Sequence, residues 1–305
     1  MGFRLALACI VLIPALASAT DETEAPSATP LLDYALEQTL PTLQYGEALT
    51  KRLASVTAEM QRHPPPEGNE CVHTLGASRF AQQYDDLGSA RSGLGDDTGA
   101  IEAYEKALAC TPRAPAIYAE LASELLHVGR LADARRAAER GTALDRDSAA
   151  LDSVLSQIDF VQERWADAVA RLRTVATTEP DDERATYWQC FLWLAQRRAG
   201  TRQPELATRN AGYDGWPTPI LDALKGSVTE ADVLAEVRKQ PDERRRREIL
   251  AEALYYLGQL RLANGDATTA RRYFAATVNL KVLYFIEHHM ALAEITKMRG
   301  DPGGD

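Results

Sequence analysis

The five histidines of the chain are its main candidates for metal ligands or general bases: His63, His73, His127, His288 and His289. None of them lies in a His-Glu-x-x-His pattern or at another spacing typical of a metal site. His288 and His289 are adjacent, so their side chains fall on different faces of a helix and supply too few ligands on one face. The sequence therefore predicts no metal site and no catalytic histidine.

Other signatures of catalysis are also missing from the sequence. Phosphate-binding loops, dinucleotide fingerprints and Gly-x-Ser-x-Gly elbows do not occur, and no pair of titratable groups is spaced for acid–base work. We therefore expect a protein that is not an enzyme and that needs no cofactor. A remote alternative is an enzyme with a site near Trp216 and His288, which a tightly bound metal in the purified protein would favour.

The cysteines predict one possible disulfide. Cys71 precedes the first helix of a predicted helical hairpin and Cys110 ends its second helix. The two ends are neighbours in an antiparallel pair, although the sequence does not fix the Cα separation that a disulfide requires. Cys190 falls on a column of small, buried positions, so we expect an inert side chain there.

The elements that would position these residues follow a repeat. Units of 34 residues begin at Ala81, Pro115, Ala149 and Glu183, and the frame returns at Ala251, although the unit from Glu183 keeps only its first helix. This period is typical of tetratricopeptide (TPR) helix-turn-helix repeats. Small side chains recur where the two helices of a unit approach, because large ones would force the backbones apart. The residues in this column are Gly88, Ala100, Ala107, Ala122, Ala134, Gly141, Ser156, Ala168, Val175, Cys190, Gly258, Ala270 and Thr277.

The sequence thus predicts an all-α fold, a TPR α-solenoid in which the repeats wind into a right-handed superhelix, with a C-terminal capping helix. Gly95, Gly129 and Gly265 fall where first helices must end. Helices before the repeats are expected to pack on the first repeat. The expected regions are a signal peptide (1–19), a flexible tether (20–30), N-terminal helices with a Pro-rich linker (31–70), repeats one to four (71–200), an irregular insertion and a helix (201–250), the last repeat with the capping helix (251–299) and a tail (300–305).

The amino terminus predicts export. Arg4 precedes an apolar run, 5–16, and Ala17-Ser18-Ala19 has the form of a signal-peptidase site, so we expect cleavage near Ala19 and a periplasmic or secreted protein. The run is shorter than the roughly 20 residues that cross a bilayer, and no later segment is long and apolar enough, so no transmembrane span is expected. Cys9 lies too early for a lipoprotein cysteine, and a lipid anchor is not expected.

Charge argues against nucleic acid as a partner. The formal net charge is −10, and 45% of the residues are hydrophobic while 26% are charged, as in folded soluble proteins. An acidic chain repels phosphate backbones. The basic run 244–247 is flanked by acids and is expected to form a solvated helix face with ion pairs along it. Partners are therefore expected to be other proteins or peptides.

First helices of TPR units line the concave side of a solenoid, and five positions in each point into it. This predicted groove is polar and weakly acidic at one end and aromatic in the middle, which favours an extended or helical partner segment with apolar anchors. An alternative is that Phe160 and Phe191 pack against a neighbouring helix. The predicted groove residues are Gln82, Asp85, Ser89, Ala119, Ser123, Leu126, His127, Ser153, Gln157, Phe160, Tyr187, Phe191, Tyr255 and Gln259.

Several motifs of the second half recur together in one arrangement: Trp216-Pro217-Thr218-Pro219-Ile220, Tyr255-Tyr256-Leu257-Gly258 and Phe285-Ile286-Glu287-His288. In these the chain resembles the NlpI family of bacterial TPR lipoproteins. The resemblance implies an envelope adaptor, often a homodimer, that brings peptidoglycan hydrolases to a processing protease. An alternative function is an assembly factor for secretion, pilus or polysaccharide-export machinery.

Overall fold

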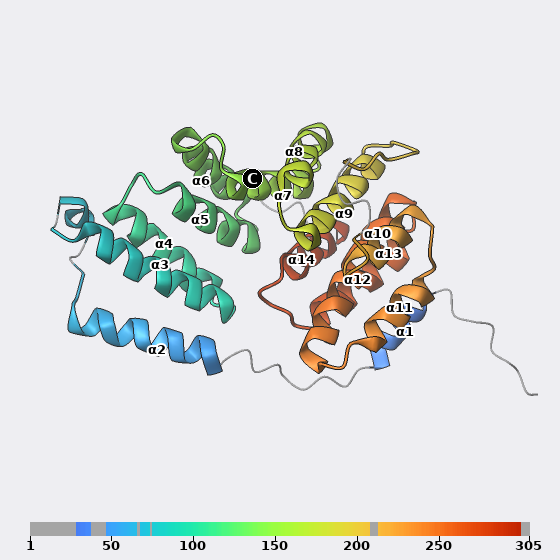
Figure 1. The fold of residues 1–305 in the computed structure, drawn as a ribbon, viewed down its shortest axis with the longest axis horizontal. Coiled ribbons are helices and arrows are strands. Elements are labelled where there is room, and N and C mark those ends of the chain that lie inside the picture. The colour runs from blue at the N-terminus through green and yellow to red at the C-terminus, as the bar shows by residue number, and fades with distance from the viewer. Residues whose placement is uncertain (1–28, 38–46, 66–67, 74, 208–212, 300–305) are drawn as a thin grey trace, which may run out of the picture.

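The computed structural model describes residues 29–37, 47–65, 68–73, 75–207 and 213–299, and these contain helices and no strand. The expected signal peptide, most of the tether and the tail lie outside the described residues. Across the part that is described, no helix combines the length and apolarity needed to cross a membrane. The predicted all-α solenoid of TPR type is confirmed by the way the helices pair, as Figure 1 shows.

Three regular hairpins form the first part of the solenoid. Each pairs two helices of similar length across a turn of a few residues, and each packs on the next, as the repeat predicted. The helices are α3 (Ala77–Gly93) with α4 (Asp97–Cys110), α5 (Pro115–His127) with α6 (Leu131–Leu144), and α7 (Ala149–Val161) with α8 (Trp165–Thr178).

The column of small residues is buried throughout, and the close packing behind it is visible at its glycines. A Cβ atom built on Gly88 would lie 2.7 Å from a ring carbon of Tyr104, and one on Gly141 would lie 2.7 Å from a methyl carbon of Leu151. Carbon atoms pack no closer than about 3.5 Å. Any larger side chain at these positions would therefore push the helices of the unit apart.

In the turns between paired helices, the residue at one equivalent position has a left-handed backbone conformation. Gly95, Gly129 and Gly265 have φ of 77°, 76° and 84°, as expected for positions that end a helix. The third hairpin places Glu163 there, with φ of 59°. An L residue with a Cβ costs about 1 kcal/mol in this conformation relative to glycine. Glu163 Oε1 lies 3.0 Å from Arg198 Nη2, an ion pair that a glycine could not make.

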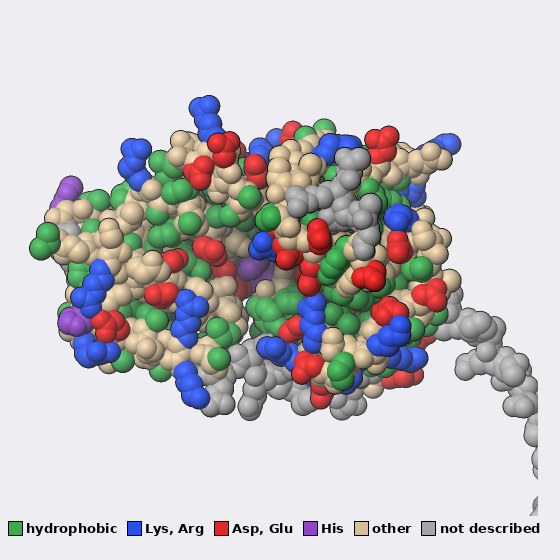
Figure 2. All heavy atoms as spheres, viewed as in Figure 1, with side chains coloured by type: hydrophobic (Ala, Val, Ile, Leu, Met, Phe, Trp, Pro, Cys, Tyr) green, Lys and Arg blue, Asp and Glu red, His purple; other side chains and the backbone are tan. Residues whose placement is uncertain are grey.

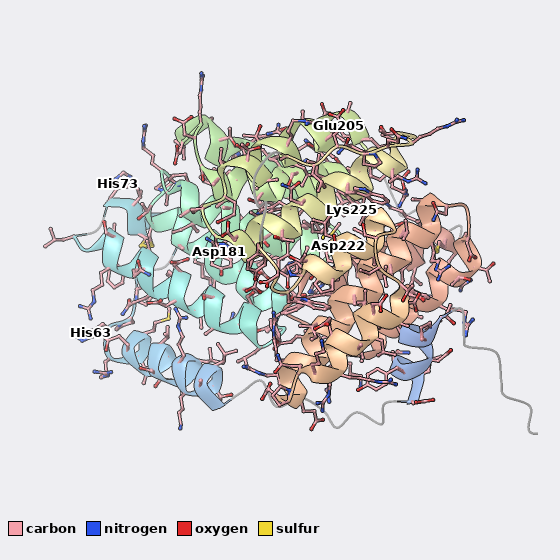
Figure 3. All side chains as sticks on the ribbon, turned by 45° about the vertical axis from the view of Figure 1, so that its right-hand side comes forward. His63, His73, Asp181, Glu205, Asp222 and Lys225 are labelled. Atoms are coloured by element: carbon pink, nitrogen blue, oxygen red, sulfur yellow. A yellow bond between two sulfur atoms is a disulfide. The ribbon has the colours of Figure 1, made fainter. Side chains whose placement is uncertain are left out.

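The fourth unit is a single long helix, α9 (Asp182–Arg198), followed by an extended segment that runs back along it. Gln189 holds this segment, because its Nε2 donates to Ala207 O at 2.9 Å and its Oε1 accepts from Ala207 N at 2.9 Å. The expected insertion at 201–250 is more helical than predicted. It contains α10 (Thr218–Lys225), where Lys225 pairs with Asp222 (Figure 3), and α11 (Glu230–Lys239).

The last unit pairs α12 (Glu243–Ala263) with α13 (Ala267–Asn279), and α14 (Ile286–Met298) follows. Helix α12 begins well before the expected start of the unit at Ala251, because Asp242 caps it by accepting from Arg245 N at 2.7 Å. The basic run therefore forms the first turns of α12. It is not wholly solvated as expected, since Arg247 is only 3% exposed.

The two N-terminal helices lie at opposite ends of the molecule (Figure 1), which corrects the expectation that both pack on the first repeat. Helix α2 (Glu47–Arg62) does pack on α3, with Arg79 bound to Glu59 at 2.6 Å. Helix α1 (Pro30–Glu37) instead packs on α11, α12 and α13, and Leu31 N donates to Glu230 Oε1 at 3.0 Å. The spacing of apolar residues in α1 predicted that one face of the helix is buried, but it did not predict which helices bury that face.

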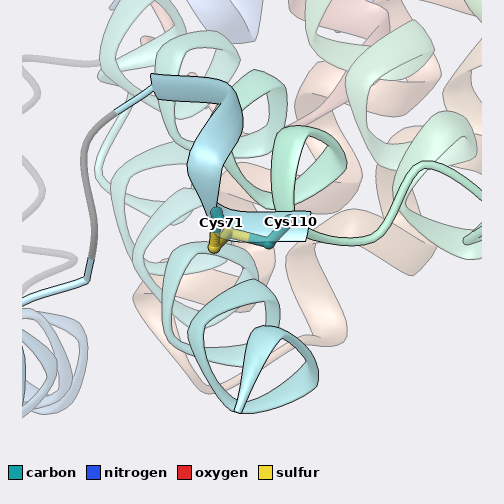
Figure 4. Close-up of a disulfide and its surroundings, with 2 residues drawn as sticks. All are labelled: Cys71 and Cys110. Atoms are coloured by element: carbon teal, nitrogen blue, oxygen red, sulfur yellow. A yellow bond between two sulfur atoms is a disulfide. The ribbon is translucent and has the colours of Figure 1, made fainter. Parts of the chain in front are cut away.

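A disulfide joins the short 3-10 helix η1 (Gly68–His73) to the end of α4 (Figure 4). The bond links Cys71 to Cys110, whose Cα atoms are 4.6 Å apart. Both cysteines are buried and, with Ala81, form a small core of their own beside the main one. The disulfide therefore fastens the segment before the first repeat to that repeat's second helix.

Candidate functional site

Helix α14 decides which part of the concave side is open. It packs on α12 and α13 and also reaches the second and third repeats. The ring of His289 stacks on that of His127 with centroids 4.2 Å apart, and Lys297 Nζ donates to Val161 O at 2.6 Å. The capping helix thus covers the concave side from the far end of the solenoid as far as α5.

The aromatic middle of the predicted groove is also buried, where α7, α9 and α12 meet. Phe160 is 0% exposed, Phe191 2% and Tyr255 0%. The rings of Phe160 and Phe191 meet edge to face with centroids 5.4 Å apart, and Phe191 meets Tyr256 at 5.3 Å. The expectation of exposed aromatic anchors is therefore wrong, and the alternative, that Phe160 and Phe191 pack against other helices, describes the structure.

Other predicted groove residues are also buried. Gln259 is fully buried, where its Oε1 accepts from Arg198 Nη1 at 2.7 Å, and Ala119 and Leu126 are 5% exposed within their hairpin. Tyr187 is half-buried and donates to Glu252 Oε2 at 2.6 Å. The repeat frame predicted a helix face, but it carries no information on which parts of that face other helices cover.

The remaining predicted residues keep accessible surface: Gln82, Asp85, Ser89, Ser123, His127, Ser153 and Gln157. Those on α3 and α5 lie among acids of α3, α4 and α5 whose charges act on one another, and Figure 2 shows a hollow with acidic and histidine side chains in this face of the molecule. We call this surface the acidic groove and define it by Gln82, Asp85, Ser89, Asp97, Glu120, Ser123 and Glu124.

Several carboxylates lie close together in the acidic groove, and the pKa values of three of them are raised. Burial and then the charge of Asp85 and Glu124 raise the pKa of Glu120, and burial followed by Asp86 raises the pKa of Asp85. Burial and Glu124 likewise raise the pKa of Asp97. Like charges therefore repel one another across α3, α4 and α5, and a cation placed in the groove would be stabilised.

Sequence reasoning missed three of these acids. Glu120, Glu124 and Asp97 fall outside the repeat positions that point into a TPR groove, although the spacing of Glu120 and Glu124 puts both on one face of α5. Glu124 is 2% exposed and accepts from Ser92 Oγ at 2.7 Å. The like charges at i and i+4 were the signal that could have revealed an acidic face.

A histidine cluster lies at the end of the acidic groove, where α14 meets the first repeats. Ligand atoms of Asp97, His127 and His289 all lie within 4.8 Å of one another. Burial and the neighbouring His127 lower the pKa of His289 to about 3, which keeps its ring neutral. The adjacent pair His288 and His289 is thus joined by partners from α4 and α5 that the sequence could not place.

A second buried group of carboxyls lies between α9, α12 and α14. Glu252 Oε2 accepts from Tyr187 Oη and, at 2.5 Å, from Trp216 Nε1. Burial and the nearby Glu287 raise the pKa of Glu252 to about 8, so the carboxyl is largely protonated at neutral pH. Glu287 accepts from Tyr256 Oη at 3.1 Å. These bonds fasten the aromatic core of the C-terminal half together.

The enzyme alternative gains nothing from this arrangement. Trp216 bonds to Glu252, whereas His288 lies beside His289, with ring centroids 5.3 Å apart. The two residues proposed for a site are thus engaged by different groups. Cys190 is fully buried as predicted, and burial raises the pKa of its thiol well above the usual value, so the nucleophilic thiolate is disfavoured.

Comparisons with known proteins add little to this geometry. No family model matches the chain. Among solved structures, the chain is similar to that of YrrB, described as a TPR protein with an unusual peptide-binding site, at 12% sequence identity and a TM-score of 0.39. The match covers 79% of this chain and 97% of that one. The TPR-type fold is therefore assigned from the chain's own helix pairs, and the resemblance to the NlpI family stays a prediction.

Proposed function

We propose that the chain is a protein-binding scaffold that holds a basic polypeptide segment in its acidic groove. The observation that carries this proposal is the crowding of Asp85, Glu120 and Glu124, where burial and then the charges of Asp85 and Glu124 raise the pKa of Glu120. Lysine or arginine side chains of a partner would relieve that repulsion and gain charge-assisted hydrogen bonds. The partner is thus basic, in contrast to the apolar anchors expected from sequence.

The cellular role follows from other features. Residues 1–19 have the form of a signal peptide, and a disulfide such as that of Cys71 and Cys110 persists in oxidising compartments such as the periplasm. Together with the resemblance to the NlpI family, these support a scaffold of the bacterial cell envelope. Its basic partners would be cell-wall hydrolases or a protease that processes them.

A photo-crosslinking experiment in the native envelope tests this function. A photoreactive amino acid at Gln82, which is exposed in the acidic groove, should capture a discrete partner that mass spectrometry identifies, with the crosslinked peptide rich in lysine and arginine. The same amino acid at Glu102, exposed on α4, is the control and should not capture that partner. Capture of the same proteins from both positions, or of an acidic or neutral peptide from Gln82, would refute the proposal.

A charge-neutralising pair of variants gives the matched binding test. The change Asp85→Asn with Glu120→Gln removes two charges from the acidic groove, and Glu102→Gln with Glu105→Gln removes two exposed charges from α4. The groove variant should weaken binding of the captured partner roughly tenfold at low salt, since exposed charges each contribute up to about 1 kcal/mol. The α4 variant should bind as the wild type does.

A further inference from the structure

Three helices bring potential metal ligands together where α14 reaches the acidic groove. Asp97 opens α4, His127 ends α5, and His289 lies in the first turn of α14. We infer that these three side chains form a binding site for a divalent transition metal of the zinc type, and that the metal fastens α14 to the first two repeats. This site shares Asp97 with the acidic groove, but its test, metal binding by the purified chain, needs no partner and so does not depend on the proposed function.

The geometry of the three ligands suits such an ion. Their ligand atoms lie within 4.8 Å of one another. Zinc bonds to nitrogen and oxygen at about 2.0–2.1 Å, so its tetrahedral ligands are about 3.4 Å apart. Binding would therefore draw the ligand atoms together by about 1 Å and would also rotate at least one imidazole about its side-chain torsions. Two imidazoles and one carboxylate are a donor set that zinc favours over calcium or magnesium.

A backbone carbonyl fixes the tautomer of His289. Its Nε2 lies 2.6 Å from the backbone oxygen of Leu283, which can only accept a hydrogen bond, so Nε2 carries the proton. The lone pair of the neutral ring then lies on Nδ1, and metal binding would replace the hydrogen bond that the side chain also forms with the backbone of His127. Metal-bound histidines in proteins are commonly fixed in this way, with one ring nitrogen donating to a carbonyl and the other bonded to the metal.

Two buried polar atoms on residues next to the cluster have no hydrogen-bond partner within the described residues, and a metal at this place would account for the first of them. Oε2 of Glu124 is one of them, and it lies 3.7 Å from His127 Nδ1. A small shift would let His127 donate to Glu124 while its other nitrogen binds the metal, a common supporting arrangement. The other atom is Nδ1 of His288, which is 9% exposed.

Charge also favours a cation at this place. Asp97 and Glu124 repel each other, and the two histidine rings are stacked 4.2 Å apart with their planes nearly parallel, at 8°. A divalent ion would neutralise both acids, and binding it would turn the two imidazoles out of their stack, because a metal lies in the plane of each ring that binds it. Three protein ligands leave one tetrahedral position for water or for a group of a bound partner.

Metal titration of the full mature chain tests the inference. After treatment with a chelator, calorimetry with zinc should give one ion per chain, and cobalt should give the visible spectrum of a tetrahedral site. Amide exchange in residues 286–298 should slow when zinc is added. The variants His289→Gln, which keeps a donor to Leu283, and Asp97→Asn should each weaken zinc binding at least tenfold.

The matched control is His63→Gln, since His63 is an exposed histidine at the end of α2, at the outer edge of the molecule (Figure 3). This variant should bind zinc as the wild type does. Circular dichroism in the presence of chelator establishes that each variant is folded. Because two different ligands are replaced, the test still holds if one of the two variants fails to fold. Absence of stoichiometric zinc binding, or equal weakening by His63→Gln, would overturn the inference.

Discussion

The two halves of the molecule use the same helical hairpin to different ends. Repeats α3 to α8 keep accessible, acid-rich surface on α3 and α5, whereas the equivalent faces of α9 and α12 pack on each other through aromatic rings, and α14 packs on α12. The small-residue column is equally buried in both halves. The repeat therefore determines how two helices of a unit pack against each other, whereas helix packing outside the repeat pattern determines whether the concave side is open.

The strongest test of this contrast is truncation of a core aromatic. Phe191→Ala should lower the free energy of unfolding by about 3–5 kcal/mol, because the ring is buried among other aromatic rings. Ser123→Ala, in the open acidic groove, should change it by no more than about 0.5 kcal/mol. Denaturant unfolding measures both. Equal, small effects would mean that the C-terminal half also has an open groove.

Removing the disulfide should affect the first half selectively. Cys71→Ala with Cys110→Ala opens a loop with a sequence separation of 39 residues and should cost about 2–4 kcal/mol. Hydrogen exchange followed by mass spectrometry should show faster exchange in α3 and α4 and unchanged exchange in α12 and α13. Uniform acceleration over both halves would show that the halves unfold as one unit.

The buried carboxyl of Glu252 should give the second half a pH dependence of its own. Its pKa is raised to about 8 from an ordinary 4.5, so the folded state holds a proton that the unfolded state releases. Its contribution to stability is complete below about pH 4.5 and is lost as the pH rises towards 8, by up to about 1.4 kcal/mol per pH unit. Glu252→Gln mimics the protonated form, and unfolding measured from pH 5 to 8 should show a flatter profile for the variant. An unchanged profile would contradict the protonated state.

The smallest expected effect is at Glu163, which connects the two halves. Glu163→Gly relieves the left-handed backbone, a gain of about 1 kcal/mol, but removes ion pairs with Arg198 and Lys297. The net stability should change by less than about 1 kcal/mol, while amide exchange in the last turn of α14 should become faster. A large stability loss with no change in α14 would show that the ion pairs do not hold that helix.

The fold was largely predictable from sequence, because tight packing leaves a periodic mark. Gly88 packs on Tyr104 within one hairpin, and Gly141 packs both on its own hairpin and on Leu151 of the next one, so their regular spacing predicted helices that pair and stack. The position of α1 on the last repeats was not predictable, since apolar residues such as Leu31 specify burial and not the surface that buries them.

The candidate site was less predictable for the same reason. Asp85 and Ser123 lie on accessible surface as expected, but the acidity of the groove depends on neighbours from three helices. The histidine cluster brings His127 close to His289, which lies 162 positions later in the sequence (289 minus 127). No local sequence pattern predicts a contact between residues so far apart. Contacts between repeats and the capping helix are long-range, and they decide which predicted surface remains available.

Hydroxyl-radical footprinting of the intact chain tests the central claim most directly, because it measures the solvent access of individual side chains. If the concave side is closed in the C-terminal half, Phe191 and Tyr255 should be as strongly protected as the core residue Tyr104, while Leu292, which is 47% exposed on α14, is readily oxidised. Oxidation of Phe191 and Tyr255 at a rate like that of Leu292 would contradict the account, since it would place both aromatic rings in an open groove.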